Sequence, residues 1–203
     1  MQPFMTLTAI TVPLPMANVD TDQIIPARFM RKSRSQGYGP YLLYDVRFDD
    51  RGQPRGMALD DPAYRGAQIL IAGRNFGGGS SREAAVYALV DFGIRCVIAP
   101  SFGDIFTNNA VKNGLLPARV DREAANRLLE AAEAQPGQRL TVDLPNQTIA
   151  LDDERFSFDV LPNHKTQLVE GRDDIDLTVR HAQEIKDWVA FDRANRPWAV
   201  PNR

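Results

Sequence analysis

Cysteine and histidine are scarce in this chain of 203 residues, which contains one cysteine and two histidines. The single cysteine, Cys96, cannot form an internal disulfide, and its place within an apolar run favours a buried structural thiol. One thiol is also too few to hold an iron–sulfur cluster or a structural zinc. His164 and His181 are far apart and show no ligand spacing, so we expect neither to be catalytic. The sequence therefore predicts no metal site within this chain.

A strong charge bias and long apolar runs are also missing. The 24 basic residues nearly balance the 26 acidic ones, for a net charge of −2, which gives no basic surface for nucleic acid. No stretch is apolar over the ~20 residues that a membrane-spanning helix needs. The first residues lack the basic start and long apolar stretch of a signal peptide. We therefore expect a cytoplasmic protein that binds neither nucleic acid nor membranes.

The residues that are present predict a mixed α/β fold. Gln68–Ala72 and Cys96–Ala99 are short apolar runs typical of buried strands, and a helix-forming segment lies between them. Such a strand–helix–strand unit usually places its two strands side by side and parallel. Thr6–Leu14 is a further strand, and Asp121–Ala134 has the spacing of an amphipathic helix capped by Asp121.

Later segments extend this pattern. Leu140–Leu144 and Thr148–Leu151 predict a hairpin, Phe156–Val160 another strand, and Leu177–Ala190 a helix. We predict a single domain over residues 1–203 with a mixed sheet and flanking helices. Residues 49–66, rich in Gly, Pro and Asp, are expected to form a surface excursion, and residues 195–203 a poorly ordered tail.

A glycine-rich turn after the first buried strand is the most informative segment. Gly77, Gly78 and Gly79 leave backbone N–H groups uncovered just before a predicted helix N-terminus, where anions are favoured. Ser80 is placed to cap that helix, with Glu83 three residues later as a capping box requires. Ser81 and Arg82 add a hydroxyl and a guanidinium that suit a carboxylate or phosphate. The alternative is an ordinary capped turn with a solvated arginine, and this segment alone favours neither.

Two polar segments near the start of the chain are further site candidates. Residues 18–22, NVDTD, place two carboxylates beside a hydroxyl directly before an apolar pair. Residues 28–34 then contain four cations in seven positions: Arg28, Arg31, Lys32 and Arg34. A charge run of this kind is usually a solvated face. The alternative is that one of these cations reaches an anionic ligand.

Three blocks of the sequence resemble the small subunit of 3-isopropylmalate dehydratase, which is similar to the mobile C-terminal domain of aconitase. The blocks are NVDTDQIIPARF, NFGGGSSRE and VIAPSFGDIFTNNAVKNGLLP, from about Asn18 to Pro117. The resemblance implies a swivelling β/β/α domain with a mixed sheet. It implies a hydro-lyase that interconverts 2- and 3-isopropylmalate by dehydration and rehydration in leucine biosynthesis. The family's [4Fe-4S] cluster belongs to a separate large subunit, so the resemblance also implies that partner.

Site residues follow from the same resemblance, position by position. Ser80 matches the serine that removes the proton beside the substrate carboxylate. Ser81 and Arg82 match residues that contact substrate, and Asp22 matches an aspartate of the site. Arg34, twelve residues after Asp22, matches a second substrate arginine. A dicarboxylate substrate suits two arginine clamps.

The sequence also departs from the family pattern. Gly78 stands where the family usually has Cys, Ala84 stands where it has His, and residues 162–176 differ from the usual C-terminal motif. These differences leave substrate choice open. One alternative is a related dehydratase for another hydroxy-dicarboxylate, of the homoaconitase or methylmalate type. Another is a non-catalytic anion-binding module with the same fold.

Overall fold

The structure, a computed structural model, describes residues 1–79, 82–172 and 174–199. Contacts within the chain divide it into two compact units, Met1–Gly171 and Arg172–Arg203. The first unit contains the sheet and all of the site segments that the described residues include. The described residues of the second unit form helices and a short 3₁₀ turn.

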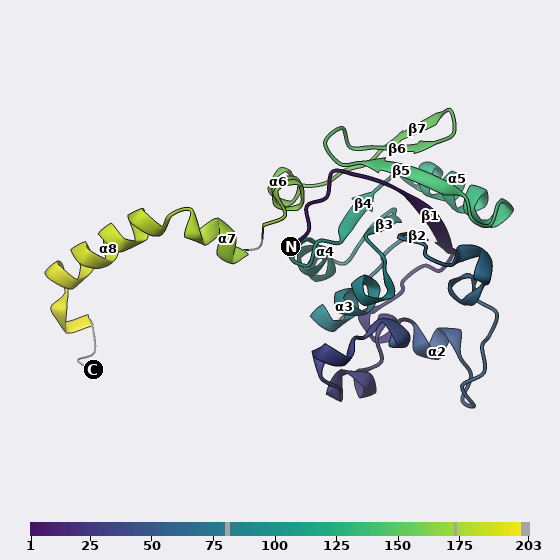
Figure 1. Cartoon of the computed structure of the whole chain (residues 1–203), viewed down its shortest axis with the longest axis horizontal. Helices are drawn as coiled ribbons and strands as arrows, with labels where there is room; N and C mark the ends of the chain where they lie inside the picture. The colour runs from purple at the N-terminus through teal and green to yellow at the C-terminus, as the bar shows by residue number, and fades with distance from the viewer. Residues whose placement is uncertain (80–81, 173, 200–203) are drawn as a thin grey trace. The chain divides into compact units, whose positions relative to one another are not determined.

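One seven-stranded sheet, in the order β4-β3-β2-β1-β5-β6-β7, organises the first unit (Figure 1). Its strands are β1 (Thr6–Leu14), β2 (Ile69–Ala72), β3 (Cys96–Ala99), β4 (Leu116–Arg119), β5 (Arg139–Asp143), β6 (Thr148–Leu151) and β7 (Glu154–Ser157). The sheet is mixed because the second half of β1 runs parallel to β2, whereas its first half runs antiparallel to β5. Strands β2, β3 and β4 are parallel neighbours, so the predicted strand–helix–strand unit and the mixed α/β fold are confirmed.

Uninterrupted apolar runs form β2 and β3 because both faces of the sheet are covered. Successive side chains of a strand point to opposite faces. Leu70 and Ala72 accordingly pack into one hydrophobic core, and Ile69 and Ile71 pack into the other. Cys96 lies in the second core and is fully buried, as predicted.

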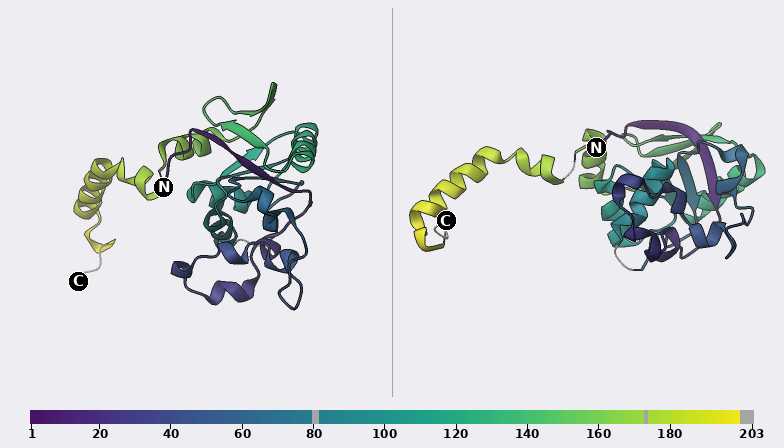
Figure 2. Two further views of the ribbon diagram at one scale, coloured as in Figure 1. Left: turned by 45° about the vertical axis from the view of Figure 1, so that its right-hand side comes forward. Right: turned by 60° about the horizontal axis from the view of Figure 1, so that its bottom comes forward.

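Helices cover the two faces of this sheet (Figure 2). Helix α5 packs against β1, β2 and β3, and its N-cap Asp121 accepts a hydrogen bond from the Ala124 N–H at 2.7 Å. Helix α3 contributes its apolar side chains to the opposite core. The helices of this unit are α1 (Thr21–Ile24), α2 (Tyr44–Arg47), α3 (Glu83–Phe92), α4 (Asp104–Lys112), α5 (Arg122–Ala134) and α6 (Pro162–Glu170). Short 3₁₀ turns span Ala27–Arg31, Arg34–Gln36, Gly39–Tyr41, Ala58–Asp60 and Pro62–Tyr64.

Several local predictions differ from the structure. The predicted hairpin forms as β5 and β6, but the next strand is Glu154–Ser157 rather than Phe156–Val160. Helix α6 was not predicted. The expected surface excursion is exposed at residues 50–56, whereas Leu59 and Tyr64 are buried, and the Tyr64 hydroxyl donates to the carbonyl of Ala132 at 3.0 Å.

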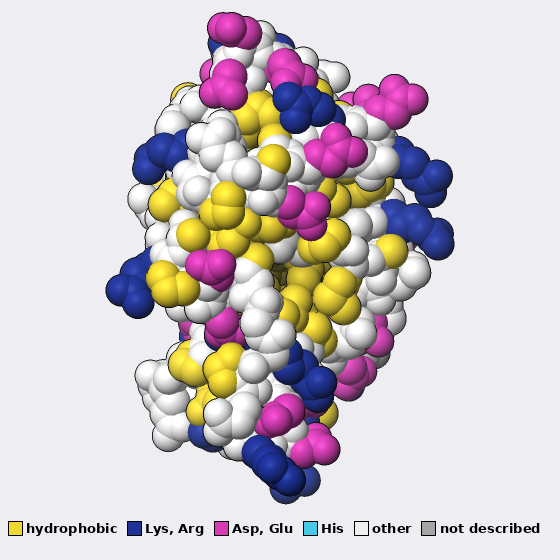
Figure 3. Space-filling view, turned by 90° about the vertical axis from the view of Figure 1, so that its right-hand side faces the viewer, with side chains coloured by type: hydrophobic (Ala, Val, Ile, Leu, Met, Phe, Trp, Pro, Cys, Tyr) yellow, Lys and Arg dark blue, Asp and Glu magenta, His cyan; other side chains and the backbone are white. Residues whose placement is uncertain are grey.

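The second unit contains α7 (Asp174–Val179), α8 (Ala182–Asn195) and a 3₁₀ turn over Pro197–Ala199. The helix predicted over Leu177–Ala190 is thus two helices. The predicted tail begins at the last residue of α8, and residues 200–203 lie outside the described part of the chain. No helix among the described residues is long and apolar enough to cross a membrane. On the face in Figure 3, side chains of both charge signs are scattered among hydrophobic ones.

Candidate functional site

Loops that follow β1, β2 and β3 meet at the carboxyl end of the parallel strands. The Asn18 N–H donates to the carbonyl of Arg74 at 2.8 Å, and the Gly77 N–H donates to that of Val19 at 2.7 Å. The Phe76 N–H donates to the carbonyl of Ser101 at 3.0 Å. These bonds extend the pairing of the sheet beyond the strands. Ligands of open α/β sheets bind outside the carboxyl ends of the strands, so this is the expected place for a site.

The polar segment after β1 is fixed by a capping box. Asp20 Oδ1 accepts from the Gln23 N–H at 2.7 Å, and Gln23 Oε1 accepts from the Asp20 N–H at 3.0 Å. This reciprocal pair holds the single turn of α1. Within that turn Thr21 is buried, whereas the side chain of Asp22 is 55% exposed. The backbone therefore presents the Asp22 carboxylate to the loop after β2.

Asp22 and Arg82 form an ion pair in which Arg82 Nη1 donates to Asp22 Oδ1. The two residues are separated by 60 positions, so only the tertiary fold brings them together. The Arg82 side chain is 20% exposed, and this residue is the N-cap of α3. A largely buried guanidinium thus lies beside a helix N-terminus, where the helix dipole also favours an anion.

The predicted capping box at α3 is wrong. Helix α3 begins at Glu83, so Glu83 is its first residue and not the third, as that motif requires. The Glu83 carboxylate instead accepts from Asn113 Nδ2 at 3.0 Å. Ser80 and Ser81 lie outside the described residues, so their predicted roles stay predictions.

The three glycines of the turn are constrained differently. Gly77 has φ +71°, and a Cβ at this position would lie 2.3 Å from Cγ of the buried Phe106 ring. Gly79 also has positive φ, whereas Gly78 does not. A Cβ on Gly78 would lie 3.1 Å from Asn75 Oδ1. The backbone conformation at position 78 would therefore allow a cysteine, but the cysteine side chain would contact that of Asn75.

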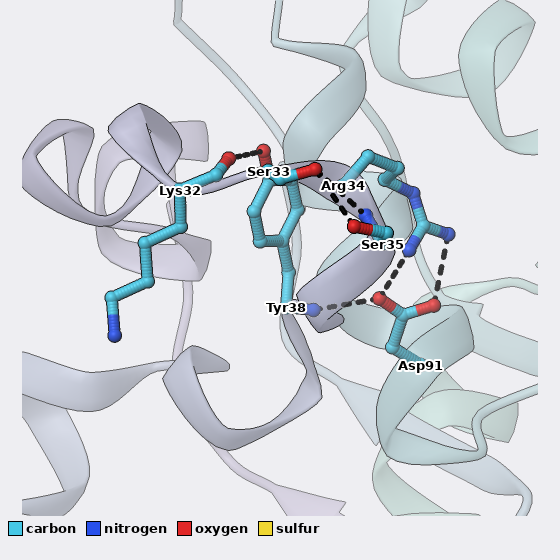
Figure 4. Close-up of polar contacts among 6 residues, drawn as sticks. All are labelled: Lys32, Ser33, Arg34, Ser35, Tyr38 and Asp91. Atoms are coloured by element: carbon cyan, nitrogen blue, oxygen red, sulfur yellow. Dashed lines mark hydrogen bonds and ion pairs between the residues drawn. The ribbon is translucent and has the colours of Figure 1, made fainter.

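Arg34 is not placed beside Asp22 and Arg82. Its Nη1 and Nη2 donate to the two carboxylate oxygens of Asp91 at 2.6 and 2.9 Å, as Figure 4 shows. The Tyr38 N–H donates to the same carboxylate at 2.7 Å, and the Arg34 guanidinium lies 4.4 Å from the centre of the Tyr87 ring. Asp91 is near the end of α3, about 12 Å along the helix axis from its first residue.

Other cations of residues 28–34 also have partners nearby. Arg28 Nη1 donates to Asp45 Oδ2 at 2.7 Å, and this hydrogen bond lowers the pKa of the Asp45 carboxyl. Lys32 Nζ lies 4.5 Å from the centre of the Tyr41 ring. The Arg28 and Lys32 side chains are exposed and each has a partner outside residues 28–34, which favours the solvated-face interpretation for both.

A pocket of about 590 Å³ lies between α4, the end of β4 and α6. Asp104, Asn108, Arg119 and His164 are among its lining residues. His164 is buried, its Nδ1 has no hydrogen-bond partner, and burial lowers the pKa of its imidazole. The sequence pattern did not predict this pocket, because one of its walls is α6 and that helix was not predicted.

Among the described residues, no group of three His, Cys, Asp or Glu side chains is placed to hold a metal ion. Burial raises the pKa of the Cys96 thiol, which disfavours the thiolate that binds iron. The residues of this chain therefore do not fit an iron–sulfur cluster.

Comparison with known proteins gives matches over nearly the whole chain. The family described as Aconitase C-terminal domain matches residues 1–123, and the one described as LeuD_N matches residues 126–162. The 3-isopropylmalate dehydratase small subunit of Rhodospirillum centenum is 48% identical over 98% of this chain and all of the relative. That of Roseobacter denitrificans is also 48% identical, over 98% of this chain and all of the relative. That of Neisseria gonorrhoeae is 44% identical over 98% of each.

A solved structure has the same fold. The crystal structure of 3-isopropylmalate dehydratase from Methanocaldococcus jannaschii is similar with a TM-score of 0.66 and 24% identity, over 90% of this chain and 99% of the other. At this identity the likeness shows the fold alone, and it agrees with the expected aconitase-type swivel domain. With family matches over both halves and relatives that are 44–48% identical over nearly their full length, the chain belongs to the aconitase C-terminal domain family, among the 3-isopropylmalate dehydratase small subunits.

Proposed function

We propose that this chain is the small subunit of a hydro-lyase that interconverts 2- and 3-isopropylmalate in leucine biosynthesis. The ion pair of Asp22 with Arg82, at the end of a GGGSSR loop, carries the proposal. The proposal also includes a large subunit that holds the [4Fe-4S] cluster, because the residues of this chain do not fit one.

Arg82 is the proposed ligand of a substrate carboxylate. A guanidinium has five N–H donors, and Asp22 accepts from Nη1. Nη2 and Nε can then donate to the two oxygens of a substrate carboxylate in the parallel arrangement that arginine favours. Asp22 fixes the orientation of the guanidinium. Ser81 adds a hydroxyl donor to the same substrate in this proposal.

Ser80 is the proposed base. A serine hydroxyl removes a carbon-bound proton only if its alkoxide is stabilised. The amides of Gly78 and Gly79, the N-terminus of α3 and the cation of Arg82 are groups of the right sign for that task, whereas the Gly77 amide already donates to the carbonyl of Val19. In dehydration, the proton beside the carboxylate passes to Ser80 Oγ, the carbon–carbon double bond forms, and the hydroxyl leaves the neighbouring carbon as water once protonated. Rehydration reverses these steps.

The glycine at position 78, where the family usually has cysteine, supports a second candidate substrate. Because a side chain at position 78 would meet Asn75, its absence changes the space beside the loop. Ala84 and residues 162–176 also depart from the family pattern. A related hydroxy-dicarboxylate of the homoaconitase or methylmalate type is therefore the alternative to isopropylmalate.

The test is co-expression with a cluster-bearing large subunit, anaerobic reconstitution, and measurement of the ultraviolet absorbance of the alkene product. We expect turnover of 2- and 3-isopropylmalate by the complex and none by the chain alone. Turnover of another 2-hydroxy-dicarboxylate in place of isopropylmalate would establish the alternative. A cluster-loaded complex that turns over neither isopropylmalate nor any other 2-hydroxy-dicarboxylate would contradict both enzyme proposals. The non-catalytic anion-binding module would then be the remaining interpretation.

A further inference from the structure

Large apolar side chains are exposed along the whole second unit. Ile175 and Val179 of α7 are 72% and 62% exposed, and Trp188 and Phe191 of α8 are 59% and 65% exposed. Ile185 of α8 and Trp198 of the last 3₁₀ turn belong to the same set, at 43% and 79%. Soluble proteins rarely expose so many large apolar residues unless these contact a partner.

The arrangement on α8 is regular. Ile185, Trp188 and Phe191 recur every three residues, so their side chains form one ridge along the helix. Helix α8, which is described throughout, contains no buried residue. A helix of 14 residues is marginal in water by itself, because most helical stability comes from packing of an apolar face. The helix therefore needs a surface to pack against.

The size and charge of the exposed apolar face indicate which kind of partner surface it packs against. An aromatic side chain carries about 150–250 Å² of surface, so the six residues leave on the order of 800 Å² exposed. That is about the area that each partner contributes to a stable protein–protein interface, ~800 Å². Residues 172–203 contain six basic and six acidic residues, so the unit carries no net charge to attract anionic lipid or nucleic acid.

We propose that the apolar ridge of α8, with Ile175 and Val179 of α7 and Trp198, is the docking surface for the large subunit, and that it fits a hydrophobic groove there. The relatives that share this segment are small subunits and are matched over nearly their full length, so the segment belongs to a protein that assembles with a larger one. The inference rests on the proposed function for the identity of the partner. It adds that assembly depends on a segment distinct from the Ser80 loop.

The test compares two double variants of the full chain. Trp188→Ala/Phe191→Ala removes two members of the ridge. Gln183→Ala/Lys186→Ala is the matched control, because at 3.6 residues per turn these positions lie on the opposite side of α8. Each protein is titrated into the cluster-loaded large subunit, and both complex formation by size-exclusion chromatography and the rate of alkene formation are followed.

The ridge variant should need at least 30-fold more protein to reach half-maximal complex formation, with the same maximal rate at saturation. The control should match the wild type. A ridge variant that binds like the wild type would overturn the docking inference and leave the proposed function intact. A wild-type complex that forms normally but turns over no substrate would contradict the proposed function, and the binding data would still decide the docking inference.

Measurements on the isolated chain separate the other possible partners of the ridge. Loss of a dimer, or a lower melting temperature, in the ridge variant alone would assign the face to a second copy or to residues 1–171. Flotation with phosphatidylserine vesicles that the ridge variant loses would assign it to a membrane. Either result would overturn the proposal.

Discussion

Replacement of Arg82 separates a role in substrate binding from a role in stability. Asp22 is 55% exposed, so the Asp22–Arg82 pair should contribute only about 0–1 kcal/mol to the free energy of unfolding. Loss of a cation that binds the substrate carboxylate in the transition state should instead cost about 2–4 kcal/mol. That cost corresponds to a fall in kcat/KM of about 30- to 1000-fold. Activity should thus fall far more than stability.

The assay uses the reconstituted complex with 3-isopropylmalate, and kcat/KM is measured for Arg82→Gln and Arg82→Lys. Lysine keeps the charge but not the planar pair of donors, so Arg82→Lys should recover only part of the loss. Arg127→Gln is the matched control, because Arg127 lies on α5, which packs into the other hydrophobic core from α3, and forms an exposed ion pair with Glu154. Its kcat/KM should equal that of the wild type.

Two results would refute the proposed role of Arg82. One is a fall in kcat/KM of less than threefold for Arg82→Gln in a complex that assembles normally. The other is a loss of several kcal/mol in the free energy of unfolding, which would show that Arg82 acts through the fold. Chemical denaturation of each isolated variant measures that free energy.

Three further predictions concern Gly77, Arg34 and His164. Gly77→Ala should lower the free energy of unfolding by about 2–4 kcal/mol, since it combines positive φ with a collision against Phe106; a loss below 1 kcal/mol would contradict the described loop geometry. Arg34→Ala should raise KM for 3-isopropylmalate at least tenfold if Arg34 leaves Asp91 to bind substrate, whereas unchanged KM with lower stability would make it purely structural. Burial lowers the pKa of His164 in the folded state, so the protein should lose stability as the pH falls below about 6.5, the pKa of an unperturbed histidine. Denaturation at pH 7.5 and 5.5 should show a smaller loss for His164→Gln, and an equal loss would contradict the burial effect.

The elements that the sequence could predict are those whose burial leaves a simple pattern. Strands β2 and β3 are buried on both faces, which produces short, uninterrupted apolar runs in the sequence. Helix α5 has one buried face and a side-chain cap, and both features are visible in the residues themselves.

Helix α6 could not be predicted in this way. Its buried residues are His164, Gln167 and Leu168, so two of the three are polar and no apolar stripe is visible in the sequence. The start of β7 was missed because its pairing with β6 depends on a tight turn in which Asp152 has φ +50°. A residue other than glycine gives little sign of that conformation.

The same distinction between local features and tertiary contacts applies to the site. The glycine-rich turn and its arginine are local features, so the residues alone were enough to raise an anion site as one interpretation, beside an ordinary capped turn. The pairing of Arg82 with Asp22 depends on the packing of loops that lie 60 residues apart, and family resemblance assigned the two residues to one site without predicting this ion pair. A count along the chain identified Arg34 but not its surroundings, because the bond to Asp91 is decided by the way residues 34–38 pack on α3.

The most direct test of the serine base is the rate of the reconstituted complex with Ser80→Ala. A positioned general base contributes about 10²–10⁴-fold, so kcat for dehydration of 3-isopropylmalate should fall by that factor. Ser81→Ala, the matched control in the same loop, should mainly raise KM. Complex formation and melting temperature should be unchanged in both variants. A Ser80→Ala complex that forms normally and keeps the wild-type kcat would contradict the proposal that this chain supplies the base.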